Sequence, residues 1–161
     1  MARCLIVGCG CRGQRLASAL LASGHAVRAT TRDPQRLAAI ADAGAEAVLA
    51  DPDRLATLMP ALEQVSVLVL PLGSAGGPPE LVSALHGPRL AALLGKLIDT
   101  PVRGVVYEST GTVDPTVLAR GATLLESVCG RSRIAYELVS ARPAEWTQVT
   151  AAAVARILRG D

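Results

Sequence analysis

Short apolar segments alternate along the chain with longer segments in which apolar residues recur every three or four positions. The short segments have the length and composition of buried strands, and the longer ones have the period of helices that bury one face. We expect strands at residues 4–7, 26–30, 45–50, 65–70, 102–107 and 134–140. We expect helices at residues 14–23, 34–43, 52–62, 90–98, 115–129 and 144–158. Strands that alternate with helices in this way indicate βαβ units and a parallel sheet.

Turn-forming residues mark the ends of several of these segments. Asp33-Pro34 and Asp51-Pro52 each place a capping carboxylate before a proline, which is the residue order of a helix start. The glycine- and proline-rich residues 73–79 are expected to form a loop. Six strands with right-handed crossovers predict a doubly wound, three-layer α/β sheet with strand order 3-2-1-4-5-6, the Rossmann fold. We expect residues 1–161 to form a single domain, because this length holds one core but not two.

Charge and aromatic content argue against nucleic-acid and membrane partners. The net charge of +2 is too small to attract a phosphate backbone or anionic lipids, and the chain has no Phe, one Trp and two Tyr on which bases could stack. We find no apolar run close to the roughly 20 residues of a membrane-spanning helix. The N-terminus lacks the long apolar stretch and the cleavage site of a signal peptide. These features predict a cytoplasmic protein whose four cysteines are reduced.

The clearest motif is Gly8-Cys9-Gly10-Cys11-Arg12-Gly13, which has the spacing G-x-G-x-x-G. It lies between an expected strand and an expected helix, which is the context that dinucleotide binding requires. Gly8 permits a tight turn, Gly10 lets the backbone approach a pyrophosphate, and Gly13 lets the helix pack against the strand. The free N–H groups and the partial positive charge of the helix N-terminus would then hold the phosphates. The alternative is a glycine turn that only packs the βαβ unit.

The end of the second strand favours NADP(H) over NAD(H). An NAD site usually has an acidic residue there, which accepts hydrogen bonds from the adenosine ribose. Here Thr31 falls at that place and Arg32 follows, and a guanidinium can bind a 2′-phosphate with two hydrogen bonds. We expect Arg12 to contribute from the glycine loop, and we interpret Asp33 as a helix N-cap. The alternative for Arg32 is a solvated side chain beside a helix start.

The glycine loop, Gly24-His25, the turn Thr31-Arg32-Asp33-Pro34 and Asp51 together resemble the atypical and extended short-chain dehydrogenase/reductases. This branch includes the NAD(P)-dependent epimerase/dehydratase-like proteins. The resemblance runs from the first strand to about Val113 and is most specific in the first half. The spacing of the glycines departs from the commoner G-x-x-G-x-x-G of that superfamily, and some atypical members share it.

The resemblance implies further site residues. Asp51 matches the acid that contacts the adenine amino group, although Pro52 lacks the backbone N–H that would make the second contact. Asp51 as a helix N-cap is the alternative. Pro71-Leu72-Gly73 matches the segment beside the cofactor ribose and nicotinamide. Thr110, and after it Ser109, matches the hydroxyl that hydrogen-bonds the substrate carbonyl, whereas the alternative is a turn at a strand end.

The family's catalytic tyrosine, followed four residues later by a lysine, has no counterpart here. Tyr107 is followed at that distance by Gly111, Tyr136 by Ser140, and the only lysine is Lys96. Arginine does not replace the lysine, because it stays charged and has a different shape. The sequence therefore leaves two functions open. One is a minimal NADP(H)-dependent oxidoreductase on a small, self-activated substrate, and the other is a non-catalytic dinucleotide-binding sensor or regulator. A partner protein that supplies the missing groups is a further alternative.

The remaining candidates are weaker. Cys9 and Cys11 have the wrong spacing for zinc, so we expect no metal site, although a thiol at the helix N-terminus could be reactive. His25 and His86 are expected to be surface or packing residues. The apolar last helix would either cover the edge of the sheet or pair with a second copy in a homodimer. The substrate is not identified by any motif.

Overall fold

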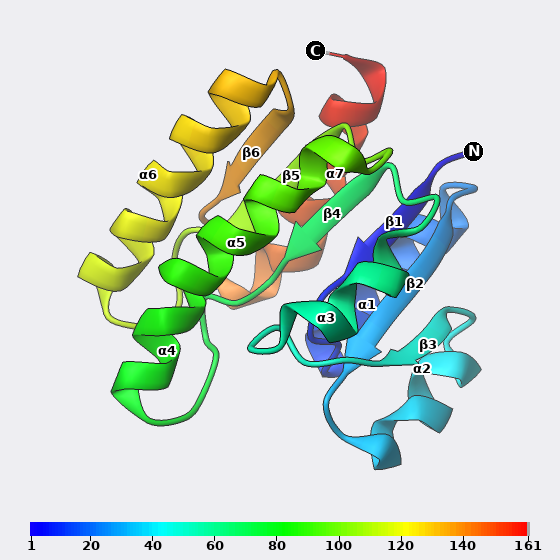
Figure 1. The fold of residues 1–161 in the computed structure, drawn as a ribbon. Helices are drawn as coiled ribbons and strands as arrows, with labels where there is room; N and C mark the ends of the chain where they lie inside the picture. The colour runs from blue at the N-terminus through cyan, green and yellow to red at the C-terminus, as the bar shows by residue number, and fades with distance from the viewer. Residues whose placement is uncertain (161) are drawn as a thin grey trace.

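The computed structural model describes residues 1–160 and is built on one parallel sheet (Figure 1). The strands are β1 (Arg3–Ile6), β2 (Ala26–Thr31), β3 (Glu46–Leu49), β4 (Val67–Leu70), β5 (Gly104–Glu108) and β6 (Ala135–Val139). They lie in the order β3-β2-β1-β4-β5-β6, and every neighbouring pair is parallel. This order confirms the predicted doubly wound Rossmann fold.

Helices cover both faces of the sheet, which gives the three layers (Figure 1). One face carries α1 (Cys11–Ala22), α2 (Leu37–Asp42) and α7 (Trp146–Arg159). The other carries α3 (Leu55–Leu58), α4 (Pro79–Leu85), α5 (Pro88–Lys96) and α6 (Pro115–Ser132). Short 3-10 turns extend four of these helices: η1 (Pro34–Arg36), η2 (Met59–Leu62), η3 (Leu97–Asp99) and η4 (Pro143–Glu145).

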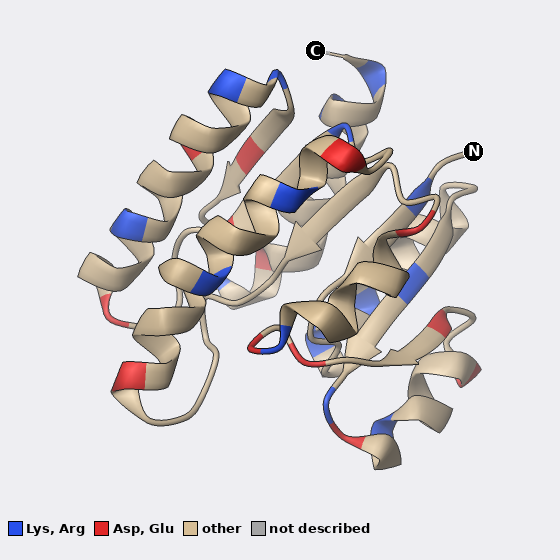
Figure 2. Ribbon diagram, in the orientation of Figure 1, with Lys and Arg blue, Asp and Glu red and all other residues tan. Residues whose placement is uncertain are grey.

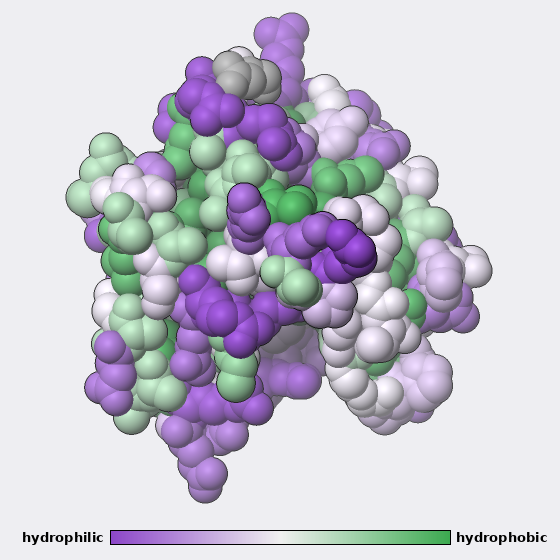
Figure 3. Space-filling model, turned by 180° about the vertical axis from the view of Figure 1, so that it is seen from behind, coloured by the Kyte–Doolittle hydropathy of each residue, from purple (hydrophilic) through white to green (hydrophobic). Residues whose placement is uncertain are grey.

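The central strand β1 is buried on both sides because its side chains alternate between two cores. Leu5 packs under α3 and α5, whereas Cys4 and Ile6 pack under α1 and α7, and all three are fully buried. The apolar face of α7 lies against this second core through Val154 and Ile157. That helix therefore covers the sheet, as one of the two alternatives predicted. On the outside of this face, apolar and polar residues are interspersed (Figure 3).

The segment before β5 differs from the sequence-based expectation. Residues Pro79–Asp99 are apolar enough to cross a membrane by length and composition alone, which corrects the expectation that no such run exists. The core helices of globular proteins pass the same test. In the fold, this stretch is α4, α5 and η3, broken at His86-Gly87, and its buried leucines join the core on that face of the sheet. The expected loop at residues 73–79 ends one residue earlier, because Pro79 is the first residue of α4 and its fixed φ suits that position.

Candidate functional site

A cavity of about 590 Å³ lies beyond the carboxyl ends of the central strands, at the neighbouring strands β1 and β4 where the strand order reverses direction. This is the topological switch point at which doubly wound sheets bind ligands. Five segments form its walls: the glycine loop, the loops after β2, β3 and β4, and helix α4. The lining residues are Gly8, Cys9, Gly10, Arg12, Thr31, Arg32, Asp33, Arg36, Ala50, Pro52, Asp53, Pro71, Leu72, Ser74, Ala75, Gly76, Gly77, Pro78, Leu81, Val82 and Leu85.

The glycine loop has the geometry that its three glycines predict. Gly8 has φ +83°, a left-handed conformation that favours glycine, and its N–H donates to Thr30 Oγ1 at 3.0 Å. Gly10 is the N-cap of α1 without a side-chain cap, so the first N–H groups of the helix lack an intrahelical acceptor. A Cβ on Gly13 would lie 3.0 Å from Cys9 Sγ, which shows the close packing of helix on strand. The loop therefore presents backbone donors to the cavity.

Two arginines line the same cavity. Arg32 is 60% exposed, and its Nη1 lies 3.6 Å from Asp53 Oδ2. Arg36 was not anticipated from the sequence, and its Nη1 lies 3.2 Å from the position that a Cβ on Gly10 would take. The available signal was a second basic residue in the turn opened by Asp33. Acidic and basic residues lie side by side in the loops after β2 and β3 (Figure 2).

The side chains around these arginines are fixed by the local turns. Thr31 is 5% exposed, and its hydroxyl accepts from the Asp33 N–H at 3.1 Å. The carboxylate of Asp33 caps η1 by accepting from Gln35, as predicted. Asp51 Oδ1 accepts from the Asp53 N–H at 2.9 Å. Asp51 lies outside the cavity-lining residues, so its contact with an adenine ring stays a prediction.

The expectation that Asp51 begins a helix is wrong. Helix α3 starts only at Leu55, with Arg54 as its N-cap. Asp51 instead stabilises the turn that leads there, since its backbone carbonyl accepts from the Arg54 N–H at 2.9 Å. From this turn, Asp53 brings a carboxylate to the cavity wall. The sequence spacing alone does not show which of Asp51 and Asp53 stabilises the turn and which lines the cavity.

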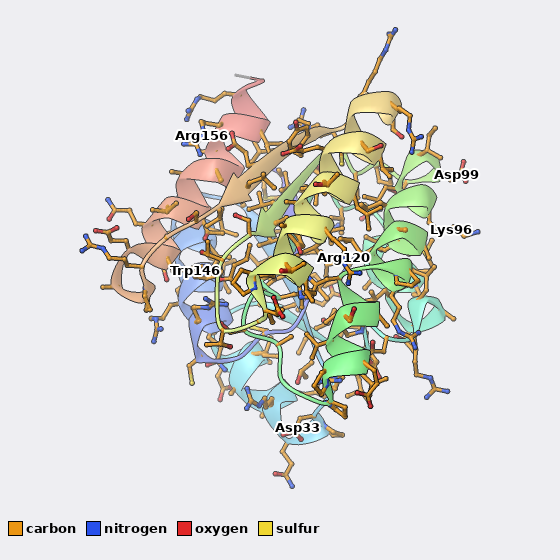
Figure 4. The ribbon with its side chains drawn as sticks, turned by 90° about the vertical axis from the view of Figure 1, so that its left-hand side faces the viewer. Asp33, Lys96, Asp99, Arg120, Trp146 and Arg156 are labelled. Atoms are coloured by element: carbon orange, nitrogen blue, oxygen red, sulfur yellow. The ribbon has the colours of Figure 1, made fainter. Side chains whose placement is uncertain are left out.

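A partly buried ion pair joins the glycine loop to the end of β5. Both terminal nitrogens of Arg12 donate to the carboxylate of Glu108, at 2.5 and 2.9 Å, and Glu108 is 4% exposed. The guanidinium also lies 4.1 Å over the ring of Trp146, which sits at the start of α7 beside α1 (Figure 4). Glu108 takes one donor from each terminal nitrogen of Arg12, which still lines the cavity, so a role for Arg12 at a 2′-phosphate stays a prediction. Sequence reasoning missed Glu108, which directly follows the expected strand 102–107 and belongs to no motif.

The loop after β4 is held by the same carboxylate. The Gly73 N–H donates to Glu108 Oε1 at 2.7 Å, and a Cβ on Gly73 would collide with the carbonyl oxygen of Thr110. Pro71 and Leu72 line the cavity, whereas Gly73 is buried behind it. The close contact explains why glycine follows β4 here.

The Ser/Thr cluster after β5 is built into turns. The hydroxyl of Ser109 donates to the carbonyl of Val139 at 3.2 Å, and Thr110 is exposed. Neither side chain is among the residues that line the cavity within the described chain. This arrangement agrees with the turn interpretation, and contact of Thr110 or Ser109 with a substrate stays a prediction.

His86 and Tyr107 form a buried pair behind the loop after β4. His86 Nε2 lies 3.0 Å from the carbonyl oxygen of Leu72, so it must carry the proton, and Nδ1 then accepts from the Tyr107 hydroxyl at 2.6 Å. Burial lowers the pKa of His86 below 6.5. Burial also raises the pKa of Tyr107 far above its usual value, with the Glu108 charge adding to the shift. Tyr107 is therefore a structural donor, and the expectation of a packing role for His86 is met.

The remaining candidates lie away from the cavity or inside the core. Lys96 lies at the far end of α5 from Asp33 and the carboxyl ends of the strands (Figure 4). Burial raises the pKa of Cys9 to about 11, with a smaller opposing effect of Arg36, whereas Cys11 is exposed. In residues 1–160 no group of three or more His, Cys, Asp or Glu could hold a metal ion.

Comparisons with known proteins agree with this geometry. The model of a family described as NAD(P)H-binding matches residues 8–156. A search of the curated proteins gave no match.

Several solved structures share the fold. The triphenylmethane reductase of Citrobacter sp., complexed with NADP(H), is 21% identical, with a TM-score of 0.63 over 84% of this chain and 48% of that chain. A putative NAD-dependent epimerase/dehydratase from Bacillus halodurans is 19% identical, with a TM-score of 0.67 over 86% and 69%. The UDP-Glc/GlcNAc 4-epimerase of Campylobacter jejuni is 12% identical, with a TM-score of 0.72 over 86% and 52%. The chain spans about half the length of several structures that it matches.

Proposed function

The chain belongs to the NAD(P)H-binding family, and we propose that it binds NADP(H) in this cavity and transfers hydride to a small acceptor. The observation that carries the cofactor choice is the position of Arg32 and Arg36 in the cavity wall next to the glycine loop. The NADP(H) complex of the Citrobacter reductase, which has the same fold, supports the proposal.

The pyrophosphate would be held by the start of α1. The first N–H groups of this 12-residue helix lack intrahelical acceptors, and the helix dipole favours an anion there. Gly10 has no side chain to block the approach, and the guanidinium of Arg36 lies over the same point. The glycine loop thus combines backbone donors with a positive charge.

The 2′-phosphate would be bound by Arg32. Its guanidinium is exposed, and its ion pair with Asp53 is long at 3.6 Å, so its donors can be turned to a phosphate. The nearest acid in sequence, Asp33, is occupied by its hydrogen bond to Gln35 in η1. Its other carboxylate oxygen lies 3.8 Å from Arg36 Nε, so the charge of Asp33 at the end of β2 is partly offset by an arginine.

Reduced nicotinamide would supply the hydride, and the site itself offers little acid catalysis. Tyr107 is buried and its pKa is raised, so it is unsuited to deliver a proton. Acceptors that take hydride without a protein acid, such as a quinone or a flavin, fit this site best, since water can supply the proton. Arg12 and Glu108 would shape the nicotinamide end by fixing the loops after β1 and β4.

A non-catalytic sensor is the second candidate. The observation that favours it is the burial of hydroxyl and carboxylate groups in structural contacts, with Ser109 bonded to Val139 and Glu108 bonded to Arg12. In that case the bound nucleotide would change the contacts of a partner protein without being oxidised. A hydride-transfer assay separates the two functions.

The experiment is a calorimetric titration of the protein with NADPH and NADH, repeated on Arg32→Gln. NADPH should bind more tightly than NADH, and the substitution should weaken NADPH binding by roughly tenfold to a hundredfold, the range for a hydrogen bond to a charged group. Arg103→Gln is the matched control, because Arg103 is exposed just before β5 at the opposite end of the sheet. Equal affinity for both nucleotides would overturn the cofactor choice. NADPH oxidation with a panel of quinones and flavins then tests turnover.

A further inference from the structure

Asp53 lies between two arginines at the edge of the cavity. Its Oδ2 is 3.6 Å from Arg32 Nη1, and its Oδ1 is 3.1 Å from Arg89 Nε. Arg89 also donates through Nη1 to the backbone carbonyl of Asp53 at 2.5 Å. Arg89 is the second residue of α5, and it reaches across to the loop after β3 from the other side of the cavity wall.

The position of Asp53 is unfavourable for an NADP(H) site. Its carboxylate lines the cavity, and the side chain is only 22% exposed. A negative charge there repels a 2′-phosphate and competes with it for the guanidinium of Arg32. The backbone of Asp53 is held at this place, because its N–H donates to Asp51 and its carbonyl accepts from Arg89.

We propose that Arg89 determines nucleotide specificity by neutralising Asp53, which frees Arg32 for the 2′-phosphate. Arg89 is itself outside the cavity-lining residues, so it acts through Asp53 and is a positioning residue. The inference rests on the proposed binding of NADP(H). It adds the ion pair between Arg89 of α5 and Asp53 of the loop after β3 to the contacts that the glycine loop and the end of β2 would make with the cofactor.

A structural role for Arg89 makes a different prediction. If Arg89 only anchors the loop through the Asp53 carbonyl, its loss would weaken NADPH and NADH equally, since both share the adenosine moiety. If Arg89 neutralises Asp53, its loss would change the ratio of the two affinities. The change in the affinity ratio would then be seen only in proteins that keep the Asp53 carboxylate.

The test is the ratio of NADPH to NADH affinity in wild type, Arg89→Gln, Asp53→Asn and the double variant, measured at low ionic strength where screening is weakest. Arg89→Gln should lower the ratio by roughly threefold to fivefold, as expected for a partly exposed charge. Asp53→Asn should raise the ratio, and Arg89→Gln should have no further effect on it in the Asp53→Asn background. Arg89→Lys should preserve most of the preference, and Arg103→Gln is the charge-matched control.

The possible results distinguish a failure of the role of Arg89 from a failure of NADP(H) binding itself. An equal loss for both nucleotides, or an Arg89→Gln effect that persists without the Asp53 carboxylate, would overturn the inference and leave NADP(H) binding intact. A wild-type protein without preference for NADPH would instead overturn the proposed function, and the inference with it. Thermal unfolding of each variant confirms that the compared proteins are folded.

Discussion

Arg12 and Glu108 meet in a two-point ion pair that links the first turn of α1 to the end of β5, 96 residues later in the chain. The same carboxylate accepts from Gly73, and the same guanidinium stacks on Trp146. One pair of charges therefore fixes the loops after β1 and β4 and the start of α7. In the proposed site, the loops after β1 and β4 would form the nicotinamide end, whereas the start of α7 lies outside the cavity-lining residues.

Breaking this pair should destabilise the protein. Glu108→Gln leaves Arg12 without its counter-charge, and we expect a loss of about 1–3 kcal/mol in the free energy of unfolding, below that for a fully buried pair because Arg12 is 30% exposed. Urea unfolding measures it. The control is Glu145→Gln, which breaks the exposed pair with Arg142 and should cost less than about 0.5 kcal/mol. Arg12→Gln should cost less in the Glu108→Gln background, and simple additivity of the two losses would contradict the account.

Two glycines of α6 should respond in opposite ways to alanine. A Cβ on Gly121 would collide with the hydroxyl of Tyr107, whereas a Cβ on Gly130 meets no atom within 4 Å. Gly121→Ala should therefore destabilise the protein by about 1–3 kcal/mol. Gly130→Ala should stabilise it by about 0.5–1 kcal/mol, because alanine favours the helix. Chemical denaturation compares the two, and similar effects at both positions would show that the helix moves aside.

The buried His86 should make stability depend on pH. Burial lowers its pKa in the folded protein below the unfolded value of 6.5, so the unfolded chain binds more protons as the pH falls. The contribution of His86 is complete above the unfolded pKa and is lost as the pH falls towards the folded pKa, by up to about 1.4 kcal/mol per pH unit. The stability advantage of wild type over His86→Gln should therefore shrink between about pH 7.5 and pH 5.5. A constant difference over this range would argue against the neutral, buried imidazole.

The four cysteines should differ in reactivity. Burial raises the pKa of Cys4, Cys9 and Cys129 to about 11, whereas Cys11 is exposed at the start of α1. Iodoacetamide at about pH 8 should therefore modify the folded protein only at Cys11, because the thiolate is the nucleophile. Mass spectrometry of wild type and Cys11→Ser measures this. Rapid modification of Cys9 in the folded protein would mean that the glycine loop opens.

The parts that the sequence predicts are those set by local pattern. The strand order follows from alternating strand and helix segments, and the role of Gly10 follows from a fixed spacing of glycines. The ion pair of Glu108 and the hydrogen bond between His86 and Tyr107 were not predicted, because each depends on a partner far along the chain that no local pattern indicates. Arg36 was missed because only the close approach of the loop after β2 to the glycine loop shows its function. Local sequence patterns predict the secondary structure of the backbone. Which polar side chains contact one another depends on residues that are distant in the sequence.

The most direct test of the proposed site is a phosphorus NMR titration of NADP⁺ with the protein, because it observes the pyrophosphate and the 2′-phosphate separately. The glycine loop should shift the pyrophosphate resonances, and Arg32 should shift that of the 2′-phosphate. Arg32→Gln should remove the second effect while the first remains at saturating protein. Pyrophosphate resonances that do not change on addition of the protein would contradict dinucleotide binding at the glycine loop.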